Sequence, residues 1–357
     1  MAEFHNLRIA EIYKETEDTS VITFDVPELL HEEFAFHQGQ HLTLRALIND
    51  EDVRRSYSLC SSPLDKQWRV AVKQIPGGKF STFVNTKLAS GDTMDVMPPS
   101  GIFGVDCEPE KAKNYLFFAA GSGITPVLSM IKTHLEAEPN STCKLFYVNK
   151  TAKSIIFKEE LEQLRNTYFG RFEIYYFLTK EKRDIELFNG RFDEEKMKIL
   201  TNTFIDIPDT NEVFLCGPEK MINFVGDYLV DAGLPRELMH FELFVKGLSD
   251  EDIKRAERLA KHSVVGTEIT IVDGGKEFLF TMTDLFDNIL DAALDAGADL
   301  PFACKGGVCS TCKCEVKHGE VEMKINYALD EKEVSQNLVL SCQAVPTTDK
   351  VVVDFDV

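Results

Sequence analysis

The stretch CKGGVCSTC, Cys304–Cys312, decides the fold of the C-terminal part of the chain. Its three cysteines have the spacing C-x4-C-x2-C, and a fourth cysteine follows thirty residues later. Plant-type [2Fe–2S] sites have this spacing. Two ferric ions need four thiolate ligands, two for each iron, held by a loop that can wrap around them. We therefore predict that Cys304, Cys309, Cys312 and Cys342 bind a [2Fe–2S] cluster.

Glycines inside the same loop favour a cluster over the alternatives. Gly306 and Gly307 allow backbone N–H groups to approach the sulfides and to stabilise the reduced, more negative cluster. A structural zinc site is the main alternative, because the pair Cys309 and Cys312 fits one. Zinc sites of that type usually use two such pairs, and the sequence contains one. Cys314 lies two residues beyond the loop in a predicted strand, and we expect it not to be a ligand.

Composition sets the protein class. The chain has 357 residues, 44% of them hydrophobic, and a net charge of −20, which predicts several globular domains and no nucleic-acid partner. The longest apolar stretch, 115–131, contains glycine, serine, threonine and proline, so we expect no membrane span. The first ten residues lack the pattern of a signal peptide. We therefore expect a cytoplasmic protein, in which disulfides are rare.

The residues around the cysteine loop predict a small α+β domain at 264–357. A hairpin is expected from the strands Glu268–Val272 and Phe278–Met282. A helix is expected at Asp284–Ala296, ended by Gly297. This part has 17 acidic and 7 basic residues, half of the net charge of the chain. The charged stretch 246–263 before it is expected to be a linker.

Alternating strands and helices are predicted for residues 109–245. Such alternation is typical of a parallel, doubly wound sheet. The expected strands are Tyr115–Ala120, Lys144–Val148, Phe172–Leu178 and Val213–Cys216. The expected helices are Pro126–Glu136, Phe157–Tyr168 and Pro218–Ala232.

Short strands separated by turn residues are predicted for residues 1–108, which is typical of an antiparallel barrel. One short helical stretch is expected near Ser81–Leu88. The expected strands are Leu7–Ile12, Ser20–Val26, His41–Leu47, Ser56–Cys60, Trp68–Lys73 and Thr93–Met97.

Two glycine-containing motifs follow strands of the predicted parallel sheet. GSGITP, Gly121–Pro126, follows one strand and begins a helix, a setting that suits the phosphates or the nicotinamide of a dinucleotide. Cys216-Gly217-Pro218 ends another strand at the same carboxyl edge, where such sheets bind ligands. The two motifs together predict a nucleotide site, although Cys216 alone is as easily a core residue.

Two motifs of the predicted barrel suit a flavin. Arg55–Ser58 (RSYS) combines a cation, an aromatic face and hydroxyls that could bind phosphate, stack on a flat heterocycle and donate to a ring nitrogen. Gly77–Thr82 (GGKFST) places glycines and hydroxyls at the start of a short helix, which suits a pyrophosphate. Each motif alone would be weak evidence.

The order RSYS, GGKFST, GSGITP, CGP and Glu242-Leu243-Phe244 resembles the ferredoxin–NADP reductase family. With a plant-type ferredoxin at the C-terminus, the whole chain is similar to the reductase subunits of bacterial phenylacetyl-CoA epoxidases. The resemblance implies a multidomain fold with an antiparallel β-barrel flavin domain, an α/β parallel-sheet NAD(P) domain and an α+β (β-grasp) ferredoxin domain. The implied boundaries are 1–108, 109–245 and 264–357, with 246–263 as the linker.

The resemblance also implies residue roles. Tyr57 would stack on the flavin and Ser58 would donate near its N5 atom, while Cys216 would lie near the position of hydride transfer, with Glu242 and Phe244 beside the flavin. The implied FAD-binding residues are Arg55, Ser56, Tyr57, Ser58, Val72, Lys73, Gly78, Lys79, Ser81 and Thr82. The implied nucleotide-binding residues are Gly121, Gly123, Thr125, Pro126, Lys150, Arg183, Cys216, Gly217 and Pro218.

The family implies NADPH as the electron donor, with Lys150, Lys182 and Arg183 supplying positive charge for a 2′-phosphate. The implied path runs from NADPH through FAD and [2Fe–2S] to a di-iron oxygenase acting on an aryl-CoA thioester. The acidic ferredoxin segment predicts a basic docking patch on that partner. The scattered histidines give no catalytic triad, and we expect them to be structural or exposed.

Three alternatives stay open at the level of sequence. The acceptor could be another oxygenase, such as a Rieske-type ring hydroxylase or a steroid hydroxylase. The ferredoxin part could be a redox sensor or carrier attached to an inactive reductase, against which the flavin and nucleotide motifs argue. The flavin could be FMN instead of FAD.

Overall fold

The computed structural model describes residues 4–244, 259 and 266–357. Residues 5–53 and 57–244 belong to one compact unit, and the C-terminal residues from 266 belong to a second. The predicted linker, 246–263, lies outside the described residues except for Leu259. Within the described ranges, no helix is both long enough and apolar enough to cross a membrane.

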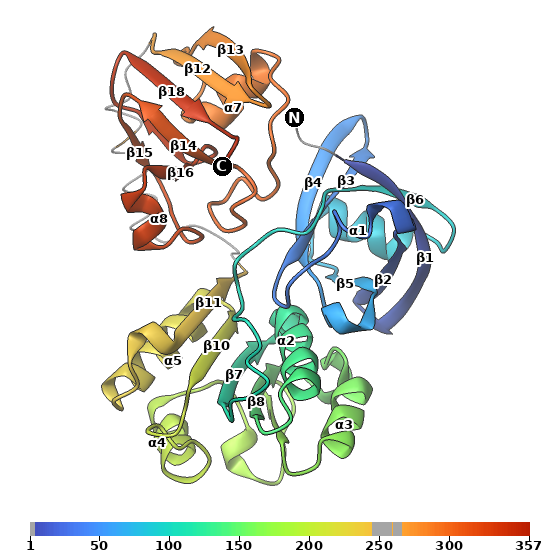
Figure 1. Cartoon of the computed structure of the whole chain (residues 1–357). Coiled ribbons are helices and arrows are strands. Elements are labelled where there is room, and N and C mark those ends of the chain that lie inside the picture. Colours follow the sequence, from blue (N-terminus) through green and yellow to red (C-terminus); the bar gives the residue numbers. More distant parts are fainter. Residues whose placement is uncertain (1–3, 245–258, 260–265) are drawn as a thin grey trace. The chain divides into compact units, whose positions relative to one another are not determined.

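The N-terminal part is a six-stranded sheet in the order β4-β3-β6-β1-β2-β5 (Figure 1). The bridge between Leu59 and Val70 joins the chain after β4 to β5. The helix α1 (Lys79–Thr86) covers the sheet through Phe80 and Val84, which lie in its apolar core. The strands are β1 (His5–Thr16), β2 (Thr19–Asp25), β3 (His41–Ile48), β4 (Glu51–Ser58), β5 (Trp68–Lys73) and β6 (Thr93–Val96).

The middle part is a five-stranded parallel sheet in the order β11-β10-β7-β8-β9. The strand order reverses between β7 and β10. From β7 the chain adds β8 and β9 on one side of the sheet, and it then adds β10 and β11 on the other side. The strands are β7 (Asn114–Ala120), β8 (Thr142–Asn149), β9 (Phe172–Leu178), β10 (Glu212–Gly217) and β11 (Met239–Leu243).

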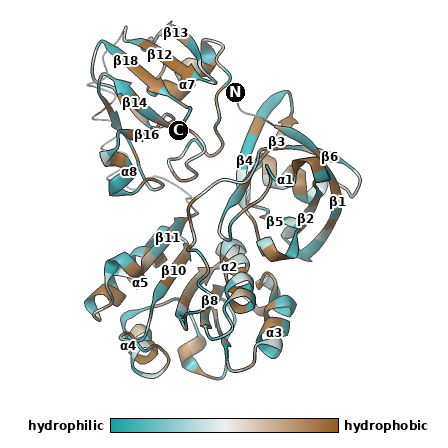
Figure 2. Ribbon diagram, viewed as in Figure 1, coloured by the Kyte–Doolittle hydropathy of each residue, from teal (hydrophilic) through white to brown (hydrophobic). Residues whose placement is uncertain are grey.

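Helices cover both faces of the parallel sheet. One apolar core joins α2 (Ile124–Ala137) and α3 (Lys158–Thr167) to one face, and a second core joins α4 (Glu194–Thr203) and α5 (Glu219–Asp231) to the other. Figure 2 shows α3 and α5 with hydrophobic and hydrophilic residues in turn along each helix. Because both faces are buried, the strands are almost continuously apolar, as in NYLFFAA of β7.

The C-terminal part is an α+β domain. Its main sheet has the order β13-β12-β18-β14-β16, with a second, two-stranded sheet of β15 and β17. The helix α7 (Ile289–Asp295) packs Ile289, Leu290 and Ala293 into the apolar core of this domain. The remaining elements are β12 (Glu268–Asp273), β13 (Lys276–Thr281), β14 (Lys313–His318), β15 (Val321–Met323), α8 (Glu331–Ser335), β16 (Leu338–Leu340), β17 (Ala344–Pro346) and β18 (Lys350–Asp354).

The predicted fold class is confirmed, but several predicted elements were wrong in extent. The helix expected from Asp284 begins at Ile289, because the side chain of Asn288 caps it by accepting from the N–H of Asp291 at 2.8 Å. Its predicted end is right, since Gly297 has φ +99°. The strand expected at Ser56–Cys60 is β4, which ends at Ser58. The elements that were not predicted are α4, β11, β15, α8, β16, β17 and β18.

Candidate functional site

The reversal of strand order between β7 and β10 places two predicted motifs side by side. Ala119 of β7 pairs with Cys216 of β10, so the loop Gly121–Gly123 and the loop after Cys216 leave the sheet at the same edge. A Cβ atom on Gly123 would lie 2.3 Å from the Cys216 carbonyl oxygen. Only glycine fits there, and the crevice at such a reversal is where open α/β sheets bind ligands.

The loop at this crevice is held by side chains of its own domain. The Thr125 hydroxyl donates to the Ser122 carbonyl oxygen at 3.0 Å, and the Tyr147 hydroxyl donates to that of Gly121 at 2.8 Å. Pro126 lies in the first turn of α2, where a missing N–H costs nothing. On the other side, Pro218 directly precedes α5. The N-termini of both helices therefore face the carboxyl edge of the sheet and favour an anion there.

A partly buried polar contact joins the barrel to the parallel sheet. Ser58, at the end of β4, donates to Glu242 Oε2 at 3.2 Å, and Cys216 Sγ lies 3.8 Å from the same oxygen. Burial raises the pKa of Glu242 to about 7, in spite of the hydrogen bonds from Ser58 and Cys216. Glu242 can therefore hold or release a proton at neutral pH at the junction of the two sheets, while burial raises the pKa of the Cys216 thiol well above its usual range and keeps it protonated.

Two aromatic residues of the prediction lie on the same compact unit as this contact. The ring of Tyr57 packs against that of Phe80 of α1, with centroids 5.8 Å apart and an angle of 32°. Phe244 donates its backbone N–H to the Gly217 carbonyl oxygen at 3.3 Å and packs on the core beneath α2. Tyr57 itself is half-buried.

The predicted phosphate-binding motif forms the N-terminus of α1. A Cβ on Gly78 would lie 2.5 Å from Ile75 Cγ1 and 2.6 Å from Ser81 Oγ, so this tight turn requires glycine. Ser81 Oγ accepts from the N–H of Ile75 at 3.2 Å, and Thr82 Oγ1 accepts from Gln74 at 3.4 Å. The tight turn at Gly78 and the hydroxyls of Ser81 and Thr82 together fit a phosphate at the N-terminus of this helix.

Other residues predicted to contact the flavin are placed differently. Val72 lies in the apolar core of the barrel, and its carbonyl oxygen accepts from Asn85 at 2.9 Å. Lys73 forms an ion pair with Asp18 at 3.4 Å, and Lys79 forms one with Glu51. Both lysine charges are therefore shared with a carboxylate. Arg55 and Ser56 belong to β4, with Arg55 exposed and Ser56 half-buried.

The cations expected near a 2′-phosphate lie after neighbouring strands. Lys150 directly follows β8 and is exposed. Arg183 follows β9, donates to the Tyr176 carbonyl oxygen at 2.7 Å and lies over the ring of Phe188, 5.5 Å from its centroid. Lys182 is exposed between them in sequence. The backbone joins the two segments, because Lys180 N–H donates to the Lys150 carbonyl oxygen at 2.8 Å.

The four predicted cluster ligands meet in the C-terminal domain as two pairs. The thiol of Cys304 is hydrogen-bonded to that of Cys309, and the thiol of Cys312 to that of Cys342. Two ligands for each of two irons is the arrangement that a [2Fe–2S] cluster requires. Cys314 lies on β14 and is buried in the domain core.

Hydrogen-bond donors surround the cysteine pairs. The backbone N–H of Gly306 donates to Cys304 Sγ at 3.2 Å, and Gln343 Nε2 donates to Cys342 Sγ at 3.5 Å. The loop needs unusual backbone angles, with φ +73° at Gly307 and +52° at Lys305. Donors to the sulfurs stabilise thiolates and the reduced state of a cluster, so the loop fits the predicted cofactor.

Polar residues between the barrel and the parallel sheet were not predicted. Arg69 donates to both carboxylate oxygens of Glu160 at 2.8 Å, and Lys132 joins Glu160 to Asp65. Ser129 donates to the Ser61 carbonyl oxygen at 2.6 Å. These contacts hold the two sheets of the compact unit in one arrangement, and no local motif announces them.

Three family models match successive parts of the chain. The oxidoreductase FAD-binding domain matches residues 6–104, the oxidoreductase NAD-binding domain matches 117–227, and the 2Fe-2S iron-sulfur cluster binding domain matches 279–347. Their order is the predicted order of the flavin, nucleotide and ferredoxin domains.

Full-length relatives share this order. The chain is 41% identical to a component of the 1,2-phenylacetyl-CoA epoxidase of Escherichia coli K12, over 100% of this chain and 99% of the relative. It is 33% identical to the ferredoxin reductase component of 3-ketosteroid-9-alpha-monooxygenase of Rhodococcus rhodochrous, over 98% and 96%. The solved structure of phthalate dioxygenase reductase has a similar fold, with a TM-score of 0.60 at 23% identity over 99% of this chain and 98% of that one.

These findings settle the family. Both full-length relatives named above are components of oxygenase systems. The FAD-binding, NAD-binding and [2Fe–2S] domains make the chain an NAD(P)H-dependent oxidoreductase. The chain belongs to the ferredoxin reductase family, among the oxygenase reductase components that carry a C-terminal [2Fe–2S] domain.

Proposed function

We propose that this protein passes electrons from NADPH through FAD and a [2Fe–2S] cluster to a di-iron oxygenase that forms the 1,2-epoxide of phenylacetyl-CoA in phenylacetate degradation. The observation that carries the proposal is the 41% identity, over the full length of both chains, to the Escherichia coli phenylacetyl-CoA epoxidase component. The substrate need not touch this protein, whose task is electron supply.

The three groups divide the work. A nicotinamide gives two electrons as a hydride, a flavin accepts the hydride and gives electrons singly, and a [2Fe–2S] cluster carries one at a time. The protein positions these groups and tunes their potentials. In the proposed boundaries, residues 1–108 hold FAD, 109–245 hold NADPH and 264–357 hold the cluster, with 246–263 as a linker.

The proposed flavin site uses the end of β4 and the start of α1. Arg55 and Ser56 would bind the flavin phosphates from β4, and Tyr57 would stack on the ring. Gly78, Lys79, Ser81 and Thr82 would hold phosphate oxygens at the N-terminus of α1, as the tight turn at Gly78 supports. Val72 packs in the core and Lys73 is paired with Asp18. Each would contact the flavin only through atoms that these contacts do not use.

Ser58, Cys216 and Glu242 are proposed to serve the reacting end of the flavin, with Phe244 beside it. Ser58 would donate to the flavin N5 atom, and its 3.2 Å contact makes Glu242 the group that holds or takes the proton. A carboxyl group with a pKa of about 7 can do both at neutral pH. Cys216 would line the position at which the nicotinamide approaches.

The proposed nucleotide site is the crevice between β7 and β10, with Gly121, Gly123, Thr125 and Pro126 on one side and Cys216, Gly217 and Pro218 on the other. Lys150 and Arg183 are proposed to select NADPH. They follow β8 and β9, the two strands on the β7 side of the crevice, and both are exposed. A lysine keeps the charge for a 2′-phosphate without the bidentate geometry of arginine.

We propose that the acceptor carries a basic patch and uses it to dock on the acidic ferredoxin domain, because opposite charges steer association. The test compares two purified oxygenases supplied with this reductase and NADPH: a phenylacetyl-CoA epoxidase with its substrate, and a 3-ketosteroid-9-alpha-hydroxylase with a steroid. Oxygenated CoA thioester from the first alone supports the proposal. Hydroxylated steroid alone would favour the second candidate, for which the 33% full-length identity to a steroid-system reductase speaks.

A further inference from the structure

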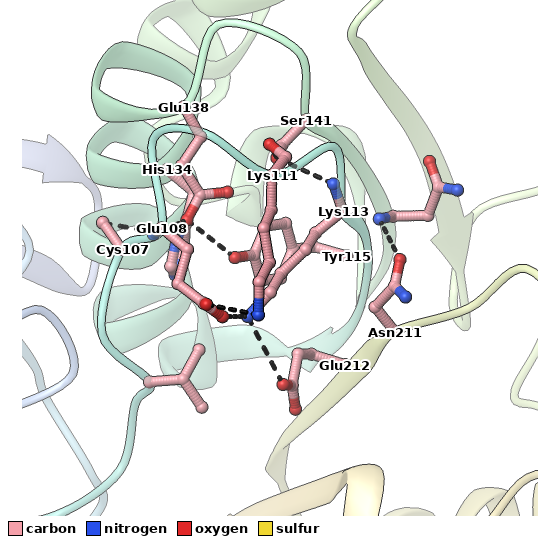
Figure 3. Close-up of polar contacts among 12 residues, drawn as sticks. Cys107, Glu108, Lys111, Lys113, Tyr115, His134, Glu138, Ser141, Asn211 and Glu212 are labelled. Carbon is pink, nitrogen blue, oxygen red and sulfur yellow. Dashed lines mark hydrogen bonds and ion pairs between the residues drawn. The ribbon is translucent and has the colours of Figure 1, made fainter.

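A cluster of cysteine, histidine and carboxylate lies at the end of the parallel sheet opposite the nucleotide crevice. Cys107 comes from the connection between β6 and β7, while His134 and Glu138 lie one helical turn apart at the C-terminal end of α2. Figure 3 shows Cys107, His134 and Tyr115 gathered around Glu138. One donor atom from each of Cys107, His134 and Glu138 lies within 4.8 Å of the others. The cluster takes no part in the proposed electron path.

The distance between the Cys107 sulfur and the His134 nitrogen matches that between neighbouring ligand atoms of a tetrahedral zinc ion. Cys107 Sγ lies 3.5 Å from His134 Nδ1, which lies 3.2 Å from Glu138 Oε1. Zinc binds sulfur at about 2.3 Å and nitrogen or oxygen at roughly 2.0–2.2 Å, so tetrahedral angles place neighbouring ligand atoms roughly 3.3–3.6 Å apart. The sulfur and the nitrogen therefore need little movement to bind one ion, and a carboxylate oxygen of Glu138 lies within 4.8 Å of both.

Without a cation, the hydrogen bonds of the cluster conflict. His134 Nδ1 faces both the Cys107 sulfur and the Glu138 carboxylate, but one ring nitrogen offers either one N–H or one lone pair. A protonated Nδ1 can serve only one of the two neighbours well, and an unprotonated Nδ1 turns its lone pair toward a carboxylate oxygen. A divalent cation removes the conflict, because all three groups then direct electron pairs at it.

Two of the three side chains have donors behind them. Glu138 Oε1 accepts from the Tyr115 hydroxyl at 2.9 Å and from the backbone N–H of Glu108 at 2.8 Å. Gln38 Nε2 lies 3.8 Å from Cys107 Sγ while donating to the Val105 carbonyl oxygen. Such outer contacts orient metal ligands and supply negative ligands with hydrogen bonds.

The burial of His134 and Glu138, and an unused acceptor on Glu138, are consistent with metal binding. His134 and Glu138 are both fully buried, and among the described residues Glu138 Oε2 and His134 Nε2 have no hydrogen-bond partner. Because Oε1 already accepts from Tyr115 and from Glu108, Oε2 is the Glu138 oxygen with lone pairs left for an ion. Cys107 is half-buried, so an ion could enter the cluster from that side.

We propose that Cys107, His134 and Glu138 bind one zinc ion through sulfur, nitrogen and oxygen, with water as the fourth ligand. The ion ties the connection between the two sheets to the end of α2, whose other end forms the nucleotide loop. This makes it a structural clip that is separate from the iron–sulfur cluster. Tyr115 and Gln38 are positioning residues of the site.

The test measures zinc binding to holoprotein that contains FAD and two irons per chain, so that the cluster cysteines are occupied. After treatment with a chelator, zinc is returned by equilibrium dialysis and counted by mass spectrometry, and its Kd is obtained by competition with a chelating dye. We expect one zinc per chain, an anomalous diffraction peak at Cys107, and X-ray absorption showing one sulfur ligand.

Variants separate this site from others. Cys107→Ser and His134→Gln should each raise the Kd for zinc at least tenfold, and Tyr115→Phe should raise it roughly tenfold through the lost contact to Glu138. Cys143→Ala, which changes a buried cysteine of the same domain outside the cluster, should leave the Kd unchanged. The proposal fails if the holoprotein binds no zinc below 10 μM free ion, taken as about the weakest useful affinity, or if Cys107→Ser binds it as tightly as the parent. A variant that does not fold is replaced by the diffraction measurement on the parent protein.

Discussion

Ser58 and Glu242 are 184 positions apart in the chain, yet Ser58 Oγ donates to Glu242 Oε2 at 3.2 Å. The contact joins the last residue of β4 in the barrel to β11 at the edge of the parallel sheet. It brings a hydroxyl and a carboxyl group with a raised pKa to the place where the flavin and nicotinamide sites are proposed to meet. A proton-transfer group from the parallel sheet is therefore in direct contact with a hydroxyl group from the barrel.

Glu242→Gln should remove a pH dependence. Burial raises the pKa of Glu242 to about 7, so its carboxylate form, which can accept a proton, becomes populated as the pH rises through 7. We expect the rate of electron transfer from flavin to cluster to increase across pH 6–8 in the parent protein and to be slower, with no inflection near 7, in the variant. Stopped-flow absorbance of the flavin measures both.

The matched control is Glu237→Gln, an exposed carboxyl group just before β11. It should keep the inflection. An inflection near 7 that persists in Glu242→Gln would assign the titration to another group.

Gly123→Ala should damage the nucleotide crevice through sterics alone. Gly123 has φ −62°, which any residue adopts, but its added Cβ would lie 2.3 Å from the Cys216 carbonyl oxygen. We expect the KM for NADPH to rise at least tenfold and the free energy of unfolding to fall by about 1–3 kcal/mol, as for other overpacked sites. Ser122→Ala, at the neighbouring position, should change neither value greatly. Equal effects of the two variants would argue against the close approach.

We expect the [2Fe–2S] cluster to require Cys309 but not Cys314. Both cysteines are buried in the same domain, but only Cys309 has another predicted ligand, Cys304, as its hydrogen-bond partner. Cys309→Ala should lose the visible absorption and the EPR signal of the reduced [2Fe–2S] cluster, and with them the reduction of cytochrome c. Cys314→Ala should retain two irons per chain. Loss of iron in Cys314→Ala with retention in Cys309→Ala would overturn the ligand assignment.

Nucleotide preference should depend on two surface cations. Lys150→Ala and Arg183→Ala should each raise the KM for NADPH roughly tenfold, the value of one lost charge–phosphate contact of about 1.4 kcal/mol, and leave the KM for NADH nearly unchanged. Lys153→Ala, an exposed lysine three residues beyond Lys150, is the control. If both KM values rise together, these cations act on the site as a whole and do not read the 2′-phosphate.

Local patterns were enough to predict most of the fold. The strand Phe172–Leu178 was predicted with its observed bounds, because a buried parallel strand is a continuous apolar run. The helix α4 was missed, since Met197 and Leu200 are its only buried residues. The N-terminal limit of α7 was wrong because Asn288, a capping residue, decides where that helix starts.

Some site residues could be predicted from local sequence, and others only from the fold. Ligand spacing within one loop predicted the four cluster cysteines, because the chemistry needs residues that are close in sequence. The contact of Ser58 with Glu242, and the approach of Cys107 to His134 and Glu138, depend on how distant segments pack, and no local spacing encodes them. His134 had been expected to be structural or exposed, and its burial between a thiol and a carboxylate is known only from the fold.

Freeze-quench EPR of the cluster during turnover tests the proposed electron path most directly. We expect NADPH to produce the signal of a reduced [2Fe–2S] cluster. That signal should decay when a phenylacetyl-CoA epoxidase, its substrate and oxygen are added, with the epoxide formed in proportion. A cluster that NADPH reduces but that stays reduced in the presence of the epoxidase, with no epoxide formed, would contradict the proposed path.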